Sequence, residues 1–477
     1  MKDNGLLIGK TPFHVIVIVL GDLGRSPRMQ YHASSLLKEG NTVSIIGYEG
    51  EDLIPALQNT TDEKLHVIRF SVPSPDIFKK VLPVYLIYRI LSLCLYLFYA
   101  LMVSVPKESS KSNTKRVDCV LVQNPPAMPL LFVVHIFCIF TAIFKGYRPA
   151  FVIDWHNLGF TMLSNSPIFA RVARLYEQIM APLATAHLCV TIEMEKYIEK
   201  EFGITDRRIH VLHDCPSSMF QPRTTKDNHE LLTKIHGKLC AGCPRSWYQN
   251  LDPDRQTLFT EKIYNSTMNG VDKYSPRMNR PALVTSSTSW TSDEDFGILL
   301  DALVRMDLRI SELQSSLKVL IIVTGKGPQK EFYQKEISML KLKNIAIQTI
   351  WLEPADYPRL LACADIGVSL HTSTSGIDLP MKILDLFGCE VPVCAYNFPC
   401  LPELVKDDVN GRIFESASDL CEQLLILLSP LDKYPGSWSP HAYSDLARYS
   451  RNLLGRKRWD ENWKENALPA IQSALSR

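Results

Sequence analysis

Hydrophobic residues in the first part of the chain form short runs that alternate with amphipathic stretches. Runs of four to eight apolar residues bounded by polar turns are typical of buried strands, and apolar positions spaced three or four apart are typical of helices. Alternation of the two predicts a parallel sheet covered by helices. Strands are predicted at 15–20, 42–47, 66–70, 118–123, 151–155, 187–191 and 209–212, and helices at 29–39 and 168–183.

The same alternation restarts at residue 282, which indicates two Rossmann-like α/β units in tandem. Strands are expected at 282–286, 318–323, 345–349 and 366–370, and helices at 293–306, 328–340 and 357–364. Ligands are expected at the carboxyl ends of the strands, in a cleft between the facing units.

Domain boundaries follow from the same pattern. We expect a first Rossmann-like unit at 1–220 and a C-terminal nucleotide-binding unit at 282–440. Residues 441–477 are expected to form a helix that packs back on the first unit. Residues 221–281 are polar, rich in Asn, Asp, Lys and Pro, and show little periodicity, so they are interpreted as a linker with an insertion.

Two segments are more hydrophobic than a water-soluble domain requires. Residues 81–105 carry one charge, Arg89, and residues 125–144 carry none. Either is long enough to span a bilayer, which takes roughly 20 apolar residues. The strand at 118–123 lies between them and must share a sheet with its neighbours, so we expect helices that lie in or dip into the membrane interface. A buried core helix is the alternative, above all for 125–144.

Composition changes this picture little. The net charge is +2, which gives no reason to expect a nucleic-acid partner. The 12 cysteines are scattered, as in proteins of a reducing compartment. Cys240 and Cys243 form a CxxC pair without a second pair, so no zinc site is expected.

The segment from 370 to 395 carries the densest candidate chemistry. Asp378, Lys382 and Asp385 fall at i, i+4 and i+7 and are expected on one face of a helix, with Ser373 and Ser375 before it. Hydroxyls, helix N–H groups and a lysine suit a diphosphate, and a carboxylate suits ribose hydroxyls. A surface helix with ordinary ion pairs is the alternative.

A glycine-containing turn follows a strand in the same unit. Gly325 and Lys326 lie in the sequence TGKGP, where a tight turn leads to a helix with proline at its first position. Lys326 could reach a diphosphate, and Thr288 is a further candidate for binding the same nucleotide. The acidic residues 293–295 open a helix, where carboxylates stabilise the helix dipole, and are not interpreted as a metal site.

The first strand also ends in a candidate anion site. Gly21 and Gly24 allow close backbone approach, and Arg25 and Arg28 add positive charge for a phosphate. The glycine spacing differs from GxGxxG, so a dinucleotide site is not expected. Asp22 in this turn is a candidate general base. A plain strand-to-helix turn is the alternative.

Asp154 and His156 follow another strand of the first unit. A carboxylate and an imidazole at the carboxyl end of a strand are candidates for acid–base catalysis. The alternative is a structural histidine, because a single histidine is more often structural than catalytic.

Five segments together resemble the chitobiosyldiphosphodolichol β-mannosyltransferase family: VLGDLGRSPRMQYHA (19–33), VIDWHNLGF (152–160), SSTSWTSDEDFGILLDAL (286–303), VTGKGP (323–328) and 371–395. The resemblance implies a GT-B fold and transfer of mannose from GDP-mannose to the 4-hydroxyl of chitobiosyl-diphosphodolichol. In that scheme the unit at 1–220 binds the acceptor, and Gly21, Gly24, Arg25 and Arg28 are expected to hold the acceptor's diphosphate. It also implies the cytosolic face of the endoplasmic reticulum membrane, with other mannosyltransferases of the pathway as candidate partners. No tightly bound cofactor or metal is expected, although Mg²⁺ could stimulate an assay.

Three departures from the family pattern matter. Glu390 stands where members of the resembled family have glycine, and the N-terminal membrane anchor of many members is not expected in the residues from Met1 onward. Related retaining enzymes carry two glutamates seven residues apart. Here the second position is Asp385 and the first is Ile377, which favours inversion. Another lipid-acceptor transferase of this fold and a non-catalytic membrane scaffold are the alternatives.

Overall fold

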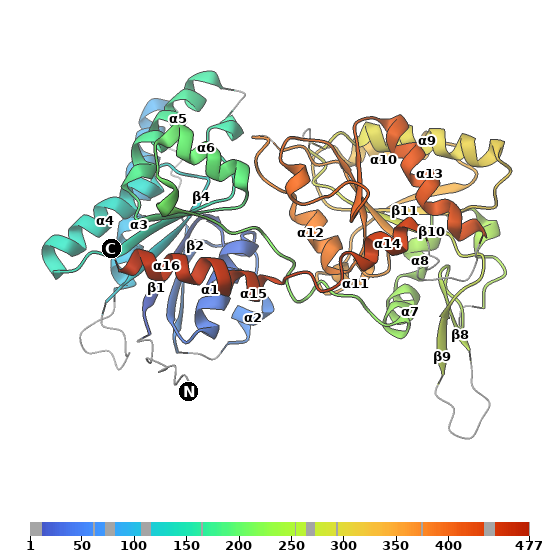
Figure 1. Cartoon of the computed structure of the whole chain (residues 1–477), viewed down its shortest axis with the longest axis horizontal. Helices are drawn as coiled ribbons and strands as arrows, with labels where there is room; N and C mark the ends of the chain where they lie inside the picture. Colours follow the sequence, from blue (N-terminus) through green and yellow to red (C-terminus); the bar gives the residue numbers. More distant parts are fainter. Residues whose placement is uncertain are drawn as a thin grey trace, which may run out of the picture. The chain divides into compact units, whose positions relative to one another are not determined.

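The computed structural model resolves the chain into two compact units (Figure 1). Unit 1 extends to His213 and includes the segment from Trp459 onward, and unit 2 comprises Asp214–Arg458. The structure describes residues 12–60, 63–71, 82–105, 116–163, 166–252, 254–263, 272–291, 294–373, 375–433 and 444–476.

Unit 1 contains a seven-stranded parallel sheet in the order β3-β2-β1-β4-β5-β6-β7. The order reverses between β1 and β4, which pair directly, for example Val17 with Leu121. Both faces of the central strands are buried, as continuous apolar runs require in a sheet covered on two sides. The strands are β1 (His14–Asp22), β2 (Thr42–Tyr48), β3 (Leu65–Phe70), β4 (Cys119–Asn124), β5 (Ala150–Trp155), β6 (Ala186–Cys189) and β7 (Ile209–Val211).

Helices connect these strands, and the end of the chain returns to them. The return begins at Trp459, later than the expected 441, because residues 444–458 belong to unit 2. Trp459 Nε1 donates to Ser35 Oγ at 3.0 Å, and Trp463 Nε1 to His32 Nδ1 at 2.9 Å. The helices are α1 (Pro27–Lys38), α2 (Pro55–Gln58), α3 (Leu82–Val103), α4 (Leu130–Lys145), α5 (Pro167–Met180), α6 (Ile192–Phe202), α15 (Trp459–Asn462) and α16 (Leu468–Leu475).

The two strongly hydrophobic segments form α3 and α4. One side of α4 packs into unit 1, where Val134 and Phe137 are fully buried, while Phe132 and Ile143 are exposed. The alternative of a wholly buried core helix for 125–144 is therefore wrong, because α4 has a core face and an uncovered face. Among the helices that the structure describes, none is long and apolar enough to cross a membrane.

Unit 2 repeats the architecture with a six-stranded parallel sheet in the order β12-β11-β10-β13-β14-β15. The strands are β10 (Ala282–Ser287), β11 (Val319–Thr324), β12 (Ile345–Ile350), β13 (Ile366–Ser369), β14 (Val393–Tyr396) and β15 (Gly411–Phe414). The helices are α9 (Phe296–Glu312), α10 (Lys330–Met339), α11 (Tyr357–Leu361), α12 (Met381–Gly388), α13 (Ala417–Lys433) and α14 (Asp445–Arg451).

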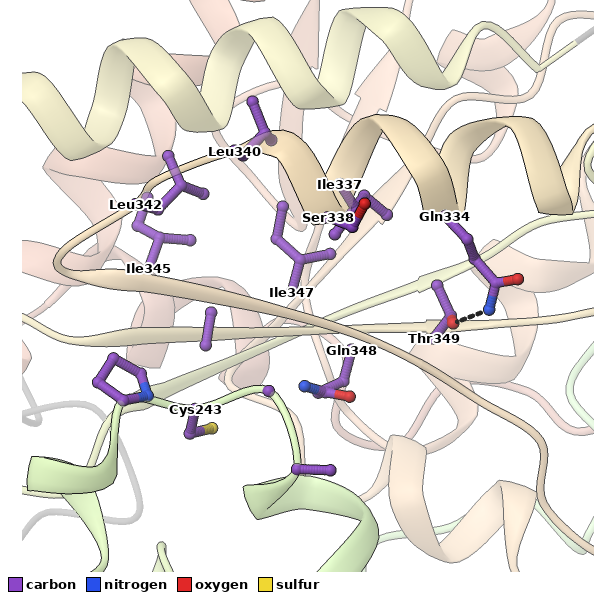
Figure 2. A pocket seen from close by; sticks show the side chains of 14 residues that line it. Cys243, Gln334, Ile337, Ser338, Leu340, Leu342, Ile345, Ile347, Gln348 and Thr349 are labelled. Atoms are coloured by element: carbon purple, nitrogen blue, oxygen red, sulfur yellow. Dashed lines mark hydrogen bonds between the residues drawn. The ribbon is translucent and has the colours of Figure 1, made fainter.

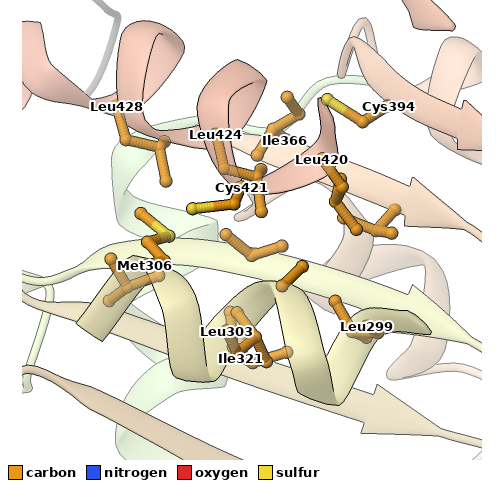
Figure 3. Packing of buried hydrophobic residues seen from close by; sticks show 14 of the residues in the cluster. Leu299, Leu303, Met306, Ile321, Ile366, Cys394, Leu420, Cys421, Leu424 and Leu428 are labelled. Atoms are coloured by element: carbon orange, nitrogen blue, oxygen red, sulfur yellow. The ribbon is translucent and has the colours of Figure 1, made fainter. Parts of the chain in front are cut away.

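The main core of unit 2 lies where α9 and α13 cover the sheet (Figure 3). Leu299, Leu303 and Met306 recur at helical spacing on α9, and Leu420 and Leu424 face them from α13. All five side chains are fully buried. This packing fixes β10 and β11, whose carboxyl ends carry the residues considered below.

The expectation of a linker at 221–281 is wrong for its described residues. They form α7 (Thr225–Lys234), α8 (His236–Cys240), β8 (Thr260–Ile263) and the antiparallel β9 (Lys273–Pro276). Leu232, Ile235 and Leu239 pack against Leu283 and Leu320 of the sheet. The apolar spacing 231, 232, 235 and 239 is helical, but the polar residues around it hide the signal.

Candidate functional site

The carboxyl ends of the unit 2 strands form the first candidate site. The strand order reverses between β10 and β13, and ligands of open α/β sheets bind at such reversals. Ser287 ends β10, Thr324 ends β11, and His371 follows β13. Thr324 Oγ1 donates to Ser287 Oγ at 3.1 Å, so hydroxyl groups of adjacent strands meet at this edge.

Two glycines bring a neighbouring turn close to the end of β10. Gly325 has a φ of 133°, and a Cβ there would collide with the carbonyl oxygen of Thr288. A Cβ on Gly327 would collide with the carbonyl oxygen of Ser289. The TGKGP turn therefore needs glycine for close backbone approach, and its position at the strand edge agrees with the expectation drawn from its sequence.

A pocket of about 290 Å³ opens at this edge. Its polar lining includes Tyr357, whose hydroxyl lies 2.9 Å from Ser287 Oγ. Lys326 Nζ lies 3.9 Å from the ring centroid of Trp351, a cation–π distance. The pocket combines one flat aromatic wall with hydroxyls and an amine. Its lining residues are Ser287, Thr288, Thr324, Gly325, Trp351, Leu352, Pro354, Tyr357 and Lys382.

Glu294 is the centre of the polar network beside this pocket. Its side chain is 2% exposed and accepts from the Ser289 backbone N–H at 2.6 Å, from the Thr288 hydroxyl and from Lys382. Lys382 Nζ also donates to Ser289 Oγ at 3.1 Å, and its side chain is 27% exposed. Glu294 thus holds a half-exposed lysine at the pocket wall, a buried carboxylate compensated by one cation.

The expectation that Glu294 only stabilises a helix dipole is therefore wrong. The capping role belongs to Asp295, which accepts from Gly297 N at 2.9 Å at the start of α9, and Asp293 lies outside the described residues. The Glu294 side chain instead turns inward, and the Glu294 backbone pairs with that of His371 in an isolated antiparallel β-bridge. Spacing could not show this, because Lys382 is 88 residues away in sequence.

The segment before α12 also differs from expectation. The helix begins at Met381 with Pro380 as its N-cap, so Asp378 lies in the preceding loop and shares no helical face with Lys382 and Asp385. Asp378 accepts from the hydroxyls of Ser373 and Ser375. Pro380 explains the later start, because the residue before a proline is disfavoured in helical conformation.

Asp378 orders this loop electrostatically. Burial raises the pKa of Asp378, but the hydrogen bond from Ser373 and the neighbouring His371 ring outweigh it, so the pKa is lowered. His371 Nε2 lies 3.8 Å from the Asp378 carboxylate, beyond hydrogen-bond distance, and His371 Nδ1 lies 4.0 Å from Glu294. The buried His371 Nε2 has no hydrogen-bond partner within the described residues.

Asp385 stands on α12 one turn after Lys382. Burial raises the pKa of Asp385 to about 8, although the charge of Lys382 opposes the rise. A carboxyl group with that pKa is mostly protonated at neutral pH, so it can donate one hydrogen bond and accept others. Either form can meet a sugar hydroxyl.

The corresponding edge of unit 1 is built around Asp154. This carboxylate is fully buried and takes two bonds of 2.8 Å from Arg28. His156 Nε2 lies 2.8 Å and His32 Nε2 3.2 Å from the same carboxylate. Burial would raise the pKa of Asp154, but the charges of Arg28 and the two histidines hold it well below its usual range.

This network bears on the residues expected at the acceptor site. Arg28 is 3% exposed and also donates to the Leu212 carbonyl at 2.9 Å, so the expectation that it binds a diphosphate does not fit its position. The Asp154 carboxylate already accepts from Arg28 and contacts two histidines, so it is poorly suited to act as a base. His156 is 24% exposed and is oriented by Asp154, an arrangement that suits a general base.

Asp22 and its neighbours form the turn after β1. The Asp22 carboxylate accepts from Gly24 N at 2.9 Å and from Glu51 N at 3.1 Å, which ties two loops together. Gly24 allows this contact, because a Cβ there would collide with Glu51, whereas Gly21 has no such close neighbour. Arg25 is exposed and pairs with Asp22 and Glu51.

A buried carboxyl group that the sequence did not single out lies beside this edge. Glu177 of α5 accepts from Asn124 Nδ2 at 3.2 Å and from Gly159 N at 3.0 Å, while its Oε2 has no partner among the described residues. Burial raises the pKa of Glu177 to about 7. The one signal in the sequence is that Glu177 lies in a helix whose apolar positions otherwise face outward.

A second pocket in unit 2, of about 570 Å³, lies between α10, β12 and the loop after α8 (Figure 2). Cys243 of the CxxC pair lines it, and Gln334 Nε2 donates to Thr349 Oγ1 at 2.7 Å across one end. It shares no residue with the pocket at Trp351. Within the described ranges, no group of three or more His, Cys, Asp or Glu residues is arranged to hold a metal ion.

Comparison with known proteins places these features in a family. The model of glycosyl transferases group 1 matches residues 281–430. UDP-glycosyltransferase TURAN of Arabidopsis thaliana is 39% identical over 97% of this chain and 97% of its own. A chitobiosyldiphosphodolichol beta-mannosyltransferase of Dictyostelium discoideum is 37% identical over 95% of this chain and 92% of its own.

Solved structures show the same architecture. A sucrose-phosphate synthase from Thermosynechococcus elongatus matches with a TM-score of 0.61 at 10% identity, covering 98% of this chain and 100% of that one. At this identity the match shows the fold alone. The expected GT-B fold with two Rossmann-like units is confirmed. From the identity over nearly its full length, the chain belongs to the family of chitobiosyldiphosphodolichol β-mannosyltransferases.

Proposed function

We propose that this chain transfers mannose from GDP-mannose to the 4-hydroxyl of chitobiosyl-diphosphodolichol, with inversion, forming a β-1,4 linkage. The acceptor hydroxyl attacks the anomeric carbon, a base takes the hydroxyl proton, and the nucleoside diphosphate leaves. Membership of the family supports the acceptor and the sugar. Ile377 in place of a glutamate supports inversion, since a retaining scheme of related enzymes uses that carboxylate.

The pocket at the carboxyl edge of unit 2 is the observation that carries the donor half of this proposal. Trp351 provides an aromatic wall for a base, and the hydroxyls of Ser287 and Tyr357 provide polar partners. Lys382 at the pocket wall and Lys326 beside it provide the positive charge that a departing diphosphate requires. Asp385 is the candidate partner of ribose hydroxyls.

Lys382 has a second role in this scheme. Before donor binding it neutralises Glu294, and a diphosphate that approaches Lys382 would share that cation. The Ser289 hydroxyl and Glu294 hold the amine in place, so it does not have to be ordered when the ligand arrives. Preorganised charge of this kind stabilises the leaving group more than a mobile surface lysine does.

His156 is the base that the geometry favours among the three candidates. Asp154 is saturated, and both carboxylate oxygens of Asp22 accept backbone N–H groups. His156 uses Nε2 toward Asp154, which leaves Nδ1 for a substrate proton. We expect His156→Ala to abolish turnover and Asp22→Asn to reduce it less, at equal donor affinity. The reverse order would assign the base to Asp22.

The reaction is tested with the purified full chain, GDP-mannose and a chitobiosyl-diphospho-lipid. A product that is cleaved by a β-mannosidase supports the proposal, and a product resistant to that enzyme but cleaved by an α-mannosidase contradicts inversion. Lys382→Met should strongly reduce turnover, while Lys335→Met, on the exposed side of α10, should not. Parallel reactions with and without Mg²⁺ measure any stimulation.

The donor nucleotide needs its own comparison. The name of the Arabidopsis thaliana relative specifies a UDP-glycosyltransferase, whereas the scheme above uses GDP-mannose. Equal concentrations of GDP-mannose, UDP-glucose and UDP-N-acetylglucosamine should yield product with GDP-mannose only. Product with a UDP-sugar and none with GDP-mannose would overturn the donor assignment while leaving a transferase of the same fold.

The proposed location is the cytosolic face of the endoplasmic reticulum membrane, where a dolichol-linked acceptor would be met. Other mannosyltransferases that use the next intermediate are the proposed partners. Protease digestion of intact microsomes should cleave the tagged full chain without added detergent. Protection until detergent is added would place the chain on the other face and contradict this location.

A further inference from the structure

The end of the chain returns to the part of unit 1 that carries the candidate base. Helix α16 packs against β5 and β6, and α15 lies beside α1 (Figure 1). Between α15 and α16 the chain forms a π-helix, Trp463–Ala467. Turns of this kind are rare and are frequently found at functional sites. Trp463 begins the turn, and its side chain is 1% exposed, so the turn places an indole inside unit 1.

This indole fixes the proton on a neighbouring histidine. Trp463 Nε1 lies 2.9 Å from Nδ1 of the fully buried His32. An indole nitrogen can only donate, so His32 Nδ1 is the acceptor and carries no proton. Burial lowers the pKa of His32, although the charge of Asp154 opposes this, so the ring is neutral at neutral pH. The single proton of the ring therefore lies on Nε2.

The proton on His32 Nε2 points to the carboxylate that contacts the candidate base. His32 Nε2 lies 3.2 Å from Asp154 Oδ2, and His156 Nε2 lies 2.8 Å from the same oxygen. Asp154 is ionised, because the neighbouring positive charges hold its pKa well below the usual range. A carboxylate only accepts, so both rings donate to it. Hydrogen bonds therefore run from Trp463 through His32 to Asp154, and the base donates to the same group.

A second pair of tryptophan and histidine in unit 1 provides a comparison. Trp155 Nε1 donates to Nδ1 of the buried His187 at 3.1 Å. His187 Nε2 has no hydrogen-bond partner among the described residues, and burial lowers the pKa of His187 to about 3. That pair needs no role beyond packing. The pair of Trp463 and His32 differs from it, because His32 also contacts an ionised carboxylate.

The charge balance around Asp154 requires a neutral His32. The charged and titratable groups that act on His32 are Asp154, Arg28 and His156. Arg28 already balances Asp154 through two bonds of 2.8 Å. A charged His32 would make the cluster net positive, and a like charge would disfavour the proton that His156 takes from the acceptor. The charged side chains of α15 and the π-helix are all exposed: Asp460, Glu461, Lys464 and Glu465.

We propose that Trp463 and His32 are positioning residues of the glycosyl transfer: Trp463 keeps His32 neutral, and His32 keeps Asp154 available as the carboxylate partner of His156. This inference rests on the proposed role of His156 as the base. Trp463 and His32 are buried, so they act through Asp154 and not on a substrate. The proton of the acceptor hydroxyl goes to His156 Nδ1, and His32 keeps its own proton throughout.

The protonation of His32 is tested without turnover. Nitrogen NMR of the full chain with isotope-labelled histidine should show His32 protonated on Nε2 only at neutral pH, and His32→Gln identifies its signals. Trp463→Phe frees the Nδ1 lone pair, so the pKa of His32 should rise. Trp459→Phe is the matched control, because it removes an indole donor of the same segment that bonds to Ser35 at 3.0 Å. A proton on Nδ1 of His32 in the unchanged chain would overturn the inference.

The pH profile of kcat/KM separates this role from a structural one. In Trp463→Phe, His32 can take a proton as the pH falls, and the charged ring opposes proton transfer to His156. The acid limb of the profile should therefore move to higher pH by about 1 pH unit. A loss of packing alone would lower the whole profile without moving the limb. Trp459→Phe should leave the limb where it is in the unchanged chain.

A double variant identifies the charge of His32 as the cause. The side chain introduced by His32→Gln can donate to Asp154 and accept from Trp463, but it cannot ionise. Combining His32→Gln with Trp463→Phe should therefore return the acid limb to its position in the unchanged chain. A limb that stays displaced in the double variant, or one that does not move in Trp463→Phe, would overturn the inference.

Failure of the proposed function gives a different result. If the unchanged chain forms no product with any of the three sugar nucleotides, the proposed function fails and no profile exists. The NMR measurement then decides, and equal pKa values of His32 in Trp463→Phe and in the unchanged chain would contradict the role of Trp463. If circular dichroism shows that Trp463→Phe does not fold, the position of the His32 proton in the unchanged chain remains the test.

Discussion

In both sheets the strand order reverses between two adjacent parallel strands. The buried carboxylate at the carboxyl edge, however, is compensated differently in the two units. In unit 1, Asp154 is fully buried, and Arg28 beside it is 3% exposed. In unit 2, Glu294 is 2% exposed, but its cation Lys382 is 27% exposed and lines a pocket. Burial of the acid alone therefore does not distinguish a structural pair from a binding site. The exposure of the cation does.

The physical reason lies in the cations that compensate each carboxylate and in how deeply those cations are buried. Asp154 takes a bidentate pair from Arg28 and two contacts from histidines, so the whole charge is balanced inside unit 1. Glu294 also accepts from the Ser289 N–H and the Thr288 hydroxyl, but its cation is Lys382, whose third N–H can turn to a ligand. A charge balanced within the protein stabilises the fold, and one shared with a half-exposed amine can also bind an anion.

The largest expected effect comes from breaking the pair in unit 1. Arg28→Met leaves Asp154 buried without its main cation and should destabilise unit 1 by about 3–5 kcal/mol. Urea unfolding followed by tryptophan fluorescence measures this. Arg25→Met, three residues earlier at an exposed ion pair, should cost no more than about 1 kcal/mol. Loss of turnover by Arg28→Met at unchanged stability would instead restore Arg28 as a ligand of substrate.

The pair in unit 2 should respond in activity. Lys382→Met should lower kcat/KM about 10²–10³-fold, as expected for removal of a preorganised charge at a leaving group. Steady-state kinetics with the donor varied measures it, and Lys335→Met is the matched control. A loss of stability in Lys382→Met that accounts for all of the lost activity would make this pair structural, like that in unit 1.

A third carboxyl group, Glu177, tests the effect of burial on a pKa separately from the effect of an ion pair. The pKa of Glu177, raised by burial to about 7, lies above its ordinary 4.5, so the native chain keeps a proton that the unfolded chain loses between these values. The free energy of unfolding should therefore fall as pH rises from about 4.5 to 7, by up to about 3 kcal/mol, and should level off above 7.

Glu177→Gln removes this titration and can keep the bonds to Asn124 and Gly159. Relative to the unchanged chain, the variant should gain stability at pH 8 and lose its pH dependence in that window. Unfolding curves at pH 5, 6, 7 and 8 test this. Parallel pH profiles for the two proteins would mean that Glu177 titrates at its ordinary pKa.

The smallest expected effect concerns the turn after α12. Glu390 has a φ of 62°, in the left-handed region that favours glycine. Glu390→Gly should stabilise unit 2 by about 1 kcal/mol. Ala362→Gly, at the end of α11 with a φ of −65°, should destabilise by a similar amount. A destabilised Glu390→Gly would mean that the glutamate side chain contributes more than the strain costs.

The comparison also shows where prediction from the sequence failed. The predicted strands lie within about two residues of the observed ones, because continuous apolar runs are local signals, whereas β8, β9 and β15 were not predicted. The supposed linker at 221–281 failed because its helical apolar spacing lies among polar residues. Asp378 was placed on α12 because i, i+4 spacing was read across Pro380. Glu294 was interpreted as stabilising a helix dipole because its partner Lys382 is far along the chain.

The sequence by itself determined the two parallel α/β units, the glycine turn at 325–327 and the family. Each depends on local periodicity or on a contiguous motif. Only the tertiary structure decided which acidic groups are balanced, which keep a proton and which face of α5 is bare. A pKa depends on burial and on partners such as Arg28, 126 residues from Asp154, and those distances exist only after folding.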